Sequence, residues 1–179
     1  VAAMAVRRRL DIDREPSMRA LAESLRIAFP NGRVLVDDLD LTDEIRTEDM
    51  GVLASRVAAL PAVRTAILAV QRDFAQAPGL VADGRDMGTV VFPHAGLKIF
   101  LDASAEARAE RRYNQLKNKG LSVSLRDLLE QIQERDARDR ERATAPLQAA
   151  HDAMLIDSTQ MTIQEVCSTV MQAAKQQLL

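Results

Sequence analysis

The chain has 179 residues, a length that suits one domain or one domain with a small insert. Because 47% of the residues are hydrophobic and 28% are charged, the composition supports a packed core and excludes a disordered protein. The net charge of −2 argues against a nucleic-acid-binding module, which needs a basic surplus, and leaves open a local basic pocket for one small phosphate.

The sequence predicts a cytoplasmic protein without a membrane partner. No apolar run approaches the ~18 residues of a membrane span, and the chain shows no signal peptide. Cys167 is the single cysteine, which excludes an internal disulfide, and we expect it to be a small buried side chain of a helix.

The N-terminal part predicts helices on either side of a small antiparallel insert. Ser17 is expected to open the first of these helices. Residues 26–42 then change to short β-prone runs that flank Pro30-Asn31-Gly32, which indicates a hairpin. Thr47 is a suitable cap for the next helix, and Pro61 suits the first turn of the one after it.

The C-terminal part predicts an α/β fold. Three short apolar runs, residues 79–83, 97–102 and 153–157, are separated by helical patterns, as in a parallel sheet covered on both faces. Each run ends in an aspartate, namely Asp83, Asp102 or Asp157. Ligands of open parallel sheets bind beyond these strand ends, but we interpret Asp102 and Asp157 first as acids where the chain meets water, because loops are generally polar.

One helix, expected to be capped by Ser124, changes character along a single face. Its apolar stripe continues directly into charged residues. The apolar members are Leu125, Leu128, Leu129 and Ile132, and the charged members are Arg135, Asp139 and Arg142. The charged end could grip a phosphate and a sugar hydroxyl, or it could be a solvated surface with i,i+4 ion pairs of ~0.2–0.5 kcal/mol each.

Two further segments carry candidate binding groups. The sequence DGRDMG, residues 83–88, combines a phosphate-suited arginine with two acids and two glycines, which permit close approach of a ligand; a tight turn with an internal Arg–Asp pair is the alternative. Residues 106–120 are rich in arginine and lysine, which fits a lid over a polyphosphate or an exposed helix that ends at Gly120. His94 and His151 lack metal-ligand spacing.

Several of these segments together resemble one family. VADGRDMGTVVFP, KIFLDAS, ERDARDRERATAPL and LIDST, with DEIRTED and PAVRTAIL, are similar to bacterial cytidylate kinases over essentially the whole chain. The resemblance implies one core over residues 1–179, with the three-layer parallel sheet and flanking helices of P-loop nucleoside-monophosphate kinases. It also implies a monophosphate-binding β insert at residues 26–46 and a short helical lid at residues 108–122.

The resemblance further implies ATP-dependent phosphorylation of CMP or dCMP by a monomer, with Mg²⁺ accompanying ATP and no direct metal ligand. It assigns Ser55, Arg64 and Asp86 to the cytosine ring. It assigns Arg135 and Asp139 to the ribose hydroxyls. It assigns Arg85 and Arg142 to the CMP phosphate and Arg111 to ATP, and these three are the expected catalytic residues. Asp83 is expected to support a metal-bound water or the phosphate loop. We therefore expect the turn after residue 82 and the far end of the Ser124 helix to converge around one nucleotide.

The chain departs from the family in one respect. The phosphate loop G-x-x-x-x-G-K-[ST] does not occur in these 179 residues. We expect Val1 to follow a missing segment of several tens of residues, which the mass of the intact polypeptide would test. Two other hypotheses stay open: a non-catalytic CMP-binding remnant, and an arginine-rich module that binds RNA or an acidic protein.

Overall fold

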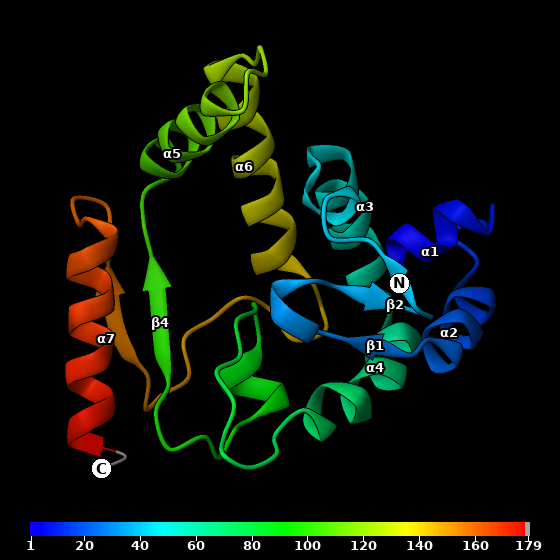
Figure 1. Ribbon diagram of the computed structural model, residues 1–179, viewed down its shortest axis with the longest axis horizontal. Coiled ribbons are helices and arrows are strands. Elements are labelled where there is room, and N and C mark those ends of the chain that lie inside the picture. The colour runs from blue at the N-terminus through cyan, green and yellow to red at the C-terminus, as the bar shows by residue number, and fades with distance from the viewer. Residues whose placement is uncertain (178–179) are drawn as a thin grey trace. The chain divides into compact units, whose positions relative to one another are not determined.

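A computed structural model describes residues 1–177, apart from the side chain of Glu48 (Figure 1). The chain divides into two compact units, Val1–Val81 and Ala82–Leu179, and each is described by itself. Within residues 1–177, no single helix is long and apolar enough to cross a membrane. Asp49–Ala58 and Pro61–Asp73 reach that length and composition only as a pair, which is bent by 97°.

The first unit packs helices and a small antiparallel sheet around one core. Its helices are α1 (Ala2–Arg7), α2 (Glu15–Ser24), α3 (Glu48–Ala58) and α4 (Pro61–Asp73), and its strands are β1 (Ile27–Ala28), β2 (Leu35–Val36) and β3 (Leu39–Asp40). Single 3-10 turns occupy Pro30–Gly32 and Glu44–Arg46. The most deeply buried large side chains are Met18, Leu41 and Val63, which join α2, the segment after β3, and α4 in one core.

The helix starts of this unit follow local signals, with one exception. Thr47 caps α3, because its hydroxyl accepts a hydrogen bond from the Met50 amide, and Pro61 is the first residue of α4, as predicted. The prediction that Ser17 opens α2 is wrong, since the helix begins at Glu15. Pro16 fits the first turn because it has no amide to leave unsatisfied, so the start lies two residues earlier.

The antiparallel strands lie within the predicted range of residues 26–42. Ile27 pairs with Val36, and Val36 pairs in turn with Leu39. The Pro30–Gly32 turn joins the first two strands, as expected. The second connection is a two-residue turn, Asp37 and Asp38, both with positive φ, which aspartate tolerates better than most residues.

The second unit contains a parallel pair of strands and three helices. Its elements are β4 (Ile99–Asp102), α5 (Ala105–Asn118), α6 (Leu125–Glu141), β5 (Met154–Asp157) and α7 (Ile163–Gln177). The strands β4 and β5 pair in parallel, from Ile99 opposite Met154 to Asp102 opposite Asp157. Helices α5 and α6 form an antiparallel hairpin (Figure 1).

Two predictions for this unit are wrong. Residues 79–83 do not form a strand, because no strand among the described residues pairs with them, and an extended segment without a hydrogen-bonded neighbour has nothing to hold it; Val81 is fully exposed. Cys167 is exposed rather than buried, because it lies on the solvent side of α7. The parallel sheet therefore has two strands within residues 1–177.

Local signals again set the helix ends. Ser124 caps α6 by accepting from the Asp127 amide. Thr162 and Glu165 form a capping box before α7: the Thr162 amide donates to the Glu165 carboxylate, and the Glu165 amide donates to the Thr162 hydroxyl. Gly120 has a positive φ of 78°, and its amide donates to the Lys117 carbonyl, so α5 ends in the expected glycine cap.

Candidate active site

The buried carboxylate of Asp139 gathers three arginines around it. Arg85 donates from Nε to Asp139 Oδ2 at 3.0 Å. Arg135 Nε lies 3.8 Å from the same oxygen, and Arg142 Nη1 lies 4.0 Å from Oδ1. We call these four residues the Asp139 cluster. The structure thus brings the turn after residue 82 to the far end of α6, across 54 positions of sequence.

The cluster occupies the continuation of the apolar stripe of α6. Leu128 is buried, whereas Leu125 is 42% exposed, so the apolar part of the stripe is only partly covered. Asp139 is 4% exposed and Arg142 has a side-chain exposure of 10%, whereas that of Arg135 is 44%, so the charged end is also buried only in part. A fully solvated charged surface therefore does not describe Asp139 and Arg142.

The cluster carries an excess of positive charge. One carboxylate faces three guanidinium groups, and Arg85 and Arg135 keep side-chain exposures of 40% and 44%. A guanidinium presents five N–H donors, of which Arg85 uses Nε on Asp139. Such an arrangement can receive an anion on its open side while Asp139 holds the arginine in place.

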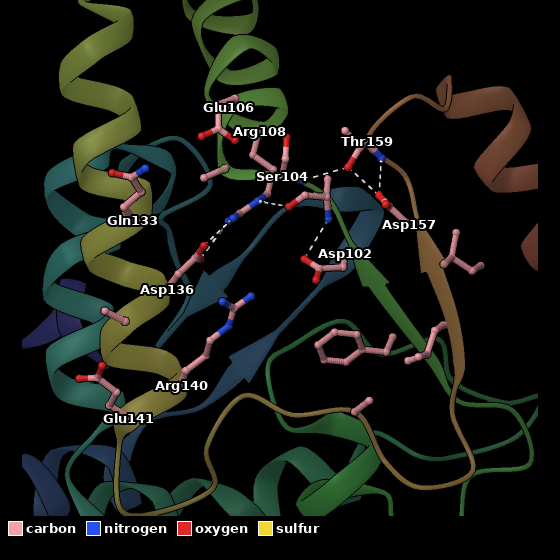
Figure 2. Close-up of a pocket in the computed structure, with 17 residues that line it drawn as sticks. Asp102, Ser104, Glu106, Arg108, Gln133, Asp136, Arg140, Glu141, Asp157 and Thr159 are labelled. Atoms are coloured by element: carbon pink, nitrogen blue, oxygen red, sulfur yellow. Dashed lines mark hydrogen bonds and ion pairs between the residues drawn. The ribbon is translucent and has the colours of Figure 1, made fainter.

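A pocket of about 940 Å³ lies at the carboxyl ends of β4 and β5, where parallel sheets bind ligands (Figure 2). Asp102 and Asp157, the last residues of the two strands, line it. Asp157 Oδ1 accepts from the amide and the hydroxyl of Thr159, and the Thr159 hydroxyl accepts from the Ser104 amide. These bonds tie the two strand ends together and hold the pocket floor.

Arg108 crosses the pocket wall to join α5 to α6. Its two Nη nitrogens donate to the two carboxylate oxygens of Asp136, with Nη1 to Oδ1 at 2.9 Å, and its Nε donates to the Ala103 carbonyl (Figure 2). Partial burial acts to raise the pKa of Asp136, but the Arg108 hydrogen bond, aided by nearby positive charges, lowers it below its ordinary value. We call this pair the Arg108 bridge.

Arg111, the expected lid contact to ATP, binds the loop after β5. It donates to the hydroxyl and the carbonyl of Ser158 and to the Met161 carbonyl at 3.4 Å. Arg111 does not line the pocket. Its guanidinium group joins α5 to this loop. To contact a polyphosphate, Arg111 would have to give up some of these hydrogen bonds or donate to the phosphate as well.

The turn with Asp83, Arg85 and Asp86 contains two glycines, Gly84 and Gly88. Neither Gly84 nor Gly88 has a positive φ, so the glycines are not needed for an unusual backbone shape. Side chains lie close to both: Met87 would have to move for a Cβ atom on Gly84, and Lys98 would lie 3.3 Å from one on Gly88. Asp86 is 7% exposed, whereas Asp83 is exposed and lies outside the pocket lining.

Ser55 and Arg64 belong to the first unit. Ser55 lies half-buried on α3, and Arg64 lies half-buried on α4 with Nη1 donating to the Ala58 carbonyl at 3.1 Å. Among the described residues, no group of three or more His, Cys, Asp or Glu side chains has the arrangement of a metal site.

Asp136 and Arg140 are among the pocket residues that sequence reasoning missed. Arg140 extends from α6 into the pocket in Figure 2, one helical turn beyond Asp136. Their i,i+4 spacing predicts that both lie on one face of the helix, beside the stripe of Arg135 and Asp139. Helical spacing does not show that this second face borders a pocket.

Comparison with known proteins agrees across nearly the whole chain. The family model described as cytidylate kinase matches residues 1–176. The chain is 54% identical to the cytidylate kinase of Aeromonas salmonicida (strain A449), with 94% of this chain and 75% of that protein covered. It is also 54% identical to the cytidylate kinases of Methylococcus capsulatus and Pseudomonas paraeruginosa, with 97% of this chain and 81% and 78% of those proteins covered.

Proposed function

Because the chain belongs to the cytidylate kinase family, a family of phosphotransferases, we propose that it transfers a phosphoryl group from ATP to CMP or dCMP and forms CDP or dCDP. The observation that carries this proposal is the Asp139 cluster, in which three guanidinium groups gather on one buried carboxylate. In-line phosphoryl transfer needs positioning and charge neutralisation, which such a cluster can supply.

Within the cluster, Arg85 and Arg142 are proposed to hold the CMP phosphate, and Arg135 and Asp139 the ribose hydroxyls. A carboxylate has about four acceptor sites, so Asp139 can hold Arg85 and still accept a hydroxyl. Because Arg142 is nearly buried, its charge acts where water screens it little. Together with Arg111, Arg85 and Arg142 are the proposed catalytic residues.

Asp86 is the proposed reader of the base. A buried carboxylate can accept a hydrogen bond from the cytosine amino group, whereas uracil would present O4, an acceptor, to the same oxygens. The resemblance also assigns Ser55 and Arg64 to the cytosine ring. We propose likewise that residues 26–46 bind the monophosphate and that residues 108–122 act as a lid. The remaining proposals are that the core has three layers, that the protein is a monomer and that it binds no nucleic acid.

The pocket is proposed to take part of the ATP polyphosphate. Its charged lining consists of the carboxylates Asp102, Glu106, Asp136, Glu141 and Asp157 and the guanidinium groups of Arg108 and Arg140. This excess of carboxylates would repel a polyphosphate without a metal ion. Carboxylate oxygens suit Mg²⁺, which keeps several of its waters in a protein site and binds only one or two carboxylates. Mg²⁺ bound with ATP would neutralise phosphate charge, and Asp83 is proposed to orient a metal-bound water.

The test is ATP-dependent phosphorylation of CMP, dCMP and UMP by the purified protein, followed by separation of the nucleoside diphosphates. We expect CDP and dCDP to form much faster than UDP. CMP binding without turnover would overturn the proposal in favour of a non-catalytic remnant. RNA binding that weakens with salt and is unaffected by CMP would overturn it in favour of an interaction module.

A further inference from the structure

Lys98 is a buried cation for which the proposed chemistry has no use. Its side chain is 6% exposed, and Nζ donates to Asp152 Oδ2 at 2.6 Å. Burying an ammonium group carries a desolvation penalty even when it is paired, and a buried ion pair often stabilises no better than an apolar side chain of the same size. The position of this lysine therefore asks for an explanation other than stability.

The stem of Lys98 lies against the turn that carries Asp86. A Cβ atom on Gly88 would lie 3.3 Å from Lys98 Cδ, 3.5 Å from Cγ and 3.7 Å from Cβ. Because Gly88 has no positive φ, its glycine is explained by this contact and not by backbone shape. Lys98 and Gly88 are thus fitted to each other, two residues from Asp86.

The turn itself is wound as a π-helix from Met87 to Val91. The Asp86 carbonyl accepts from the amides of Val90 at 2.9 Å and Val91 at 3.2 Å, and the Met87 carbonyl accepts from Phe92 at 2.7 Å. Single π turns are rare and occur often at functional sites. Lys98 supports this turn at Gly88, while its own carbonyl accepts from the Met154 amide at the start of β5.

We propose that Lys98 is a positioning residue: Asp152 fixes its ammonium group, its stem sets the place of the π turn at Gly88, and the turn thereby fixes Asp86 for discrimination between cytosine and uracil. The last step rests on the proposed function. The first two steps concern only the free protein and can be tested without substrate.

The main test compares Lys98→Met, which keeps an apolar stem and removes the ammonium group, with the parent. We expect the ratio of kcat/KM for CMP to that for UMP to fall about tenfold, because small displacements of a positioned group have large kinetic effects. The control is Ala173→Gly, which weakens α7 at a buried position outside the pocket lining; it should leave that ratio unchanged. An unchanged ratio in Lys98→Met, measured with active parent enzyme, overturns the proposal.

A second arm measures amide hydrogen exchange at Val90 and Val91 without nucleotide. We expect faster exchange in Lys98→Met, with amides of α5 unchanged in both proteins. If the parent forms no CDP, the proposed function fails, and this arm alone decides the inference; unchanged exchange at the two valines overturns it.

A third measurement covers the case in which Lys98→Met folds poorly. Gly88→Ala pushes a Cβ towards the lysine stem and should speed exchange at Val90 and Val91 in the parent background. The same change should have a smaller effect in Lys98→Ala, where the space is open, so the two changes are non-additive. Additive effects on exchange would contradict the contact on which the proposal depends.

Discussion

Two groups of charges lie about one turn apart on α6 and differ in stoichiometry. The Arg108 bridge sets one guanidinium against one carboxylate with two parallel hydrogen bonds. The Asp139 cluster sets three guanidinium groups against one carboxylate. The bridge joins two helices through one matched pair, whereas guanidinium groups outnumber carboxylates within the cluster, which we propose suits it to an incoming anion. The predictions below test this difference, beginning with the largest effect.

Removing a cation from the unbalanced cluster should affect catalysis most. We expect Arg142→Ala to lower kcat/KM for CMP by about 100- to 1,000-fold, the loss typical when one donor to a developing charge is removed. The control is Arg138→Ala on the same helix, whose side chain faces solvent and lies 3.8 Å from Glu134; it should change little. Comparable losses in both variants, with unchanged melting temperatures, would contradict the difference between the two faces of α6.

Removing the carboxylate should expose the mutual repulsion of the arginines. We expect Asp139→Asn to lower the free energy of unfolding by about 2 kcal/mol, because three guanidinium groups lose a buried counter-ion. Sulfate should restore more stability to this variant than to the parent, because it can replace the missing negative charge. Urea unfolding with and without sulfate measures this, and equal gains for both proteins would count against an anion site.

Recognition of the cytosine base should depend on Asp86, which is not part of the Asp139 cluster. We expect Asp86→Ala to reduce the preference for CMP over UMP by about tenfold, since a hydrogen bond to the amino group is lost, while phosphate binding by the cluster persists. Steady-state kinetics with both nucleotides provide the ratio. Equal kinetics for CMP and UMP in the parent as well as the variant would contradict the assignment of Asp86.

Features that depend on residues close together in the sequence could be predicted, whereas features that depend on distant residues could not. The helix starts at Thr47, Pro61 and Ser124 were predicted, because a cap is settled within a few residues. Helical spacing also placed Arg135, Asp139 and Arg142 on one face. The expected strand at residues 79–83 failed because a strand depends on a partner elsewhere in the chain.

The contacts between distant segments were beyond local patterns. The expectation that Arg85 would meet the end of α6 came from a family resemblance, since the two residues lie 54 positions apart. Neither local spacing nor the family resemblance indicated the pairing of Arg108 with Asp136, because it depends on how α5 packs on α6. Lys98 was missed for a similar reason, since its sequence position in an apolar run gives no sign of Asp152 or Gly88.

The smallest effect concerns the balanced pair, and its sign follows from the pKa. The pKa of Asp136 is lowered from its ordinary value of 3.8, so its ionised form stabilises the folded state above about pH 4, and this contribution is lost as pH falls through the lower folded pKa. Because the pair is partly exposed, we expect Asp136→Asn to lower the free energy of unfolding by about 1 kcal/mol at pH 7.

The difference between parent and Asp136→Asn should therefore be constant from pH 7 to about pH 5 and should shrink at lower pH, as measured by urea unfolding. Sulfate should not restore the stability of this variant as it does that of Asp139→Asn, because Asp136 balances one arginine and leaves no excess charge to be filled. A difference that grew as pH fell, or a sulfate rescue equal to that of Asp139→Asn, would remove the distinction between bridge and cluster.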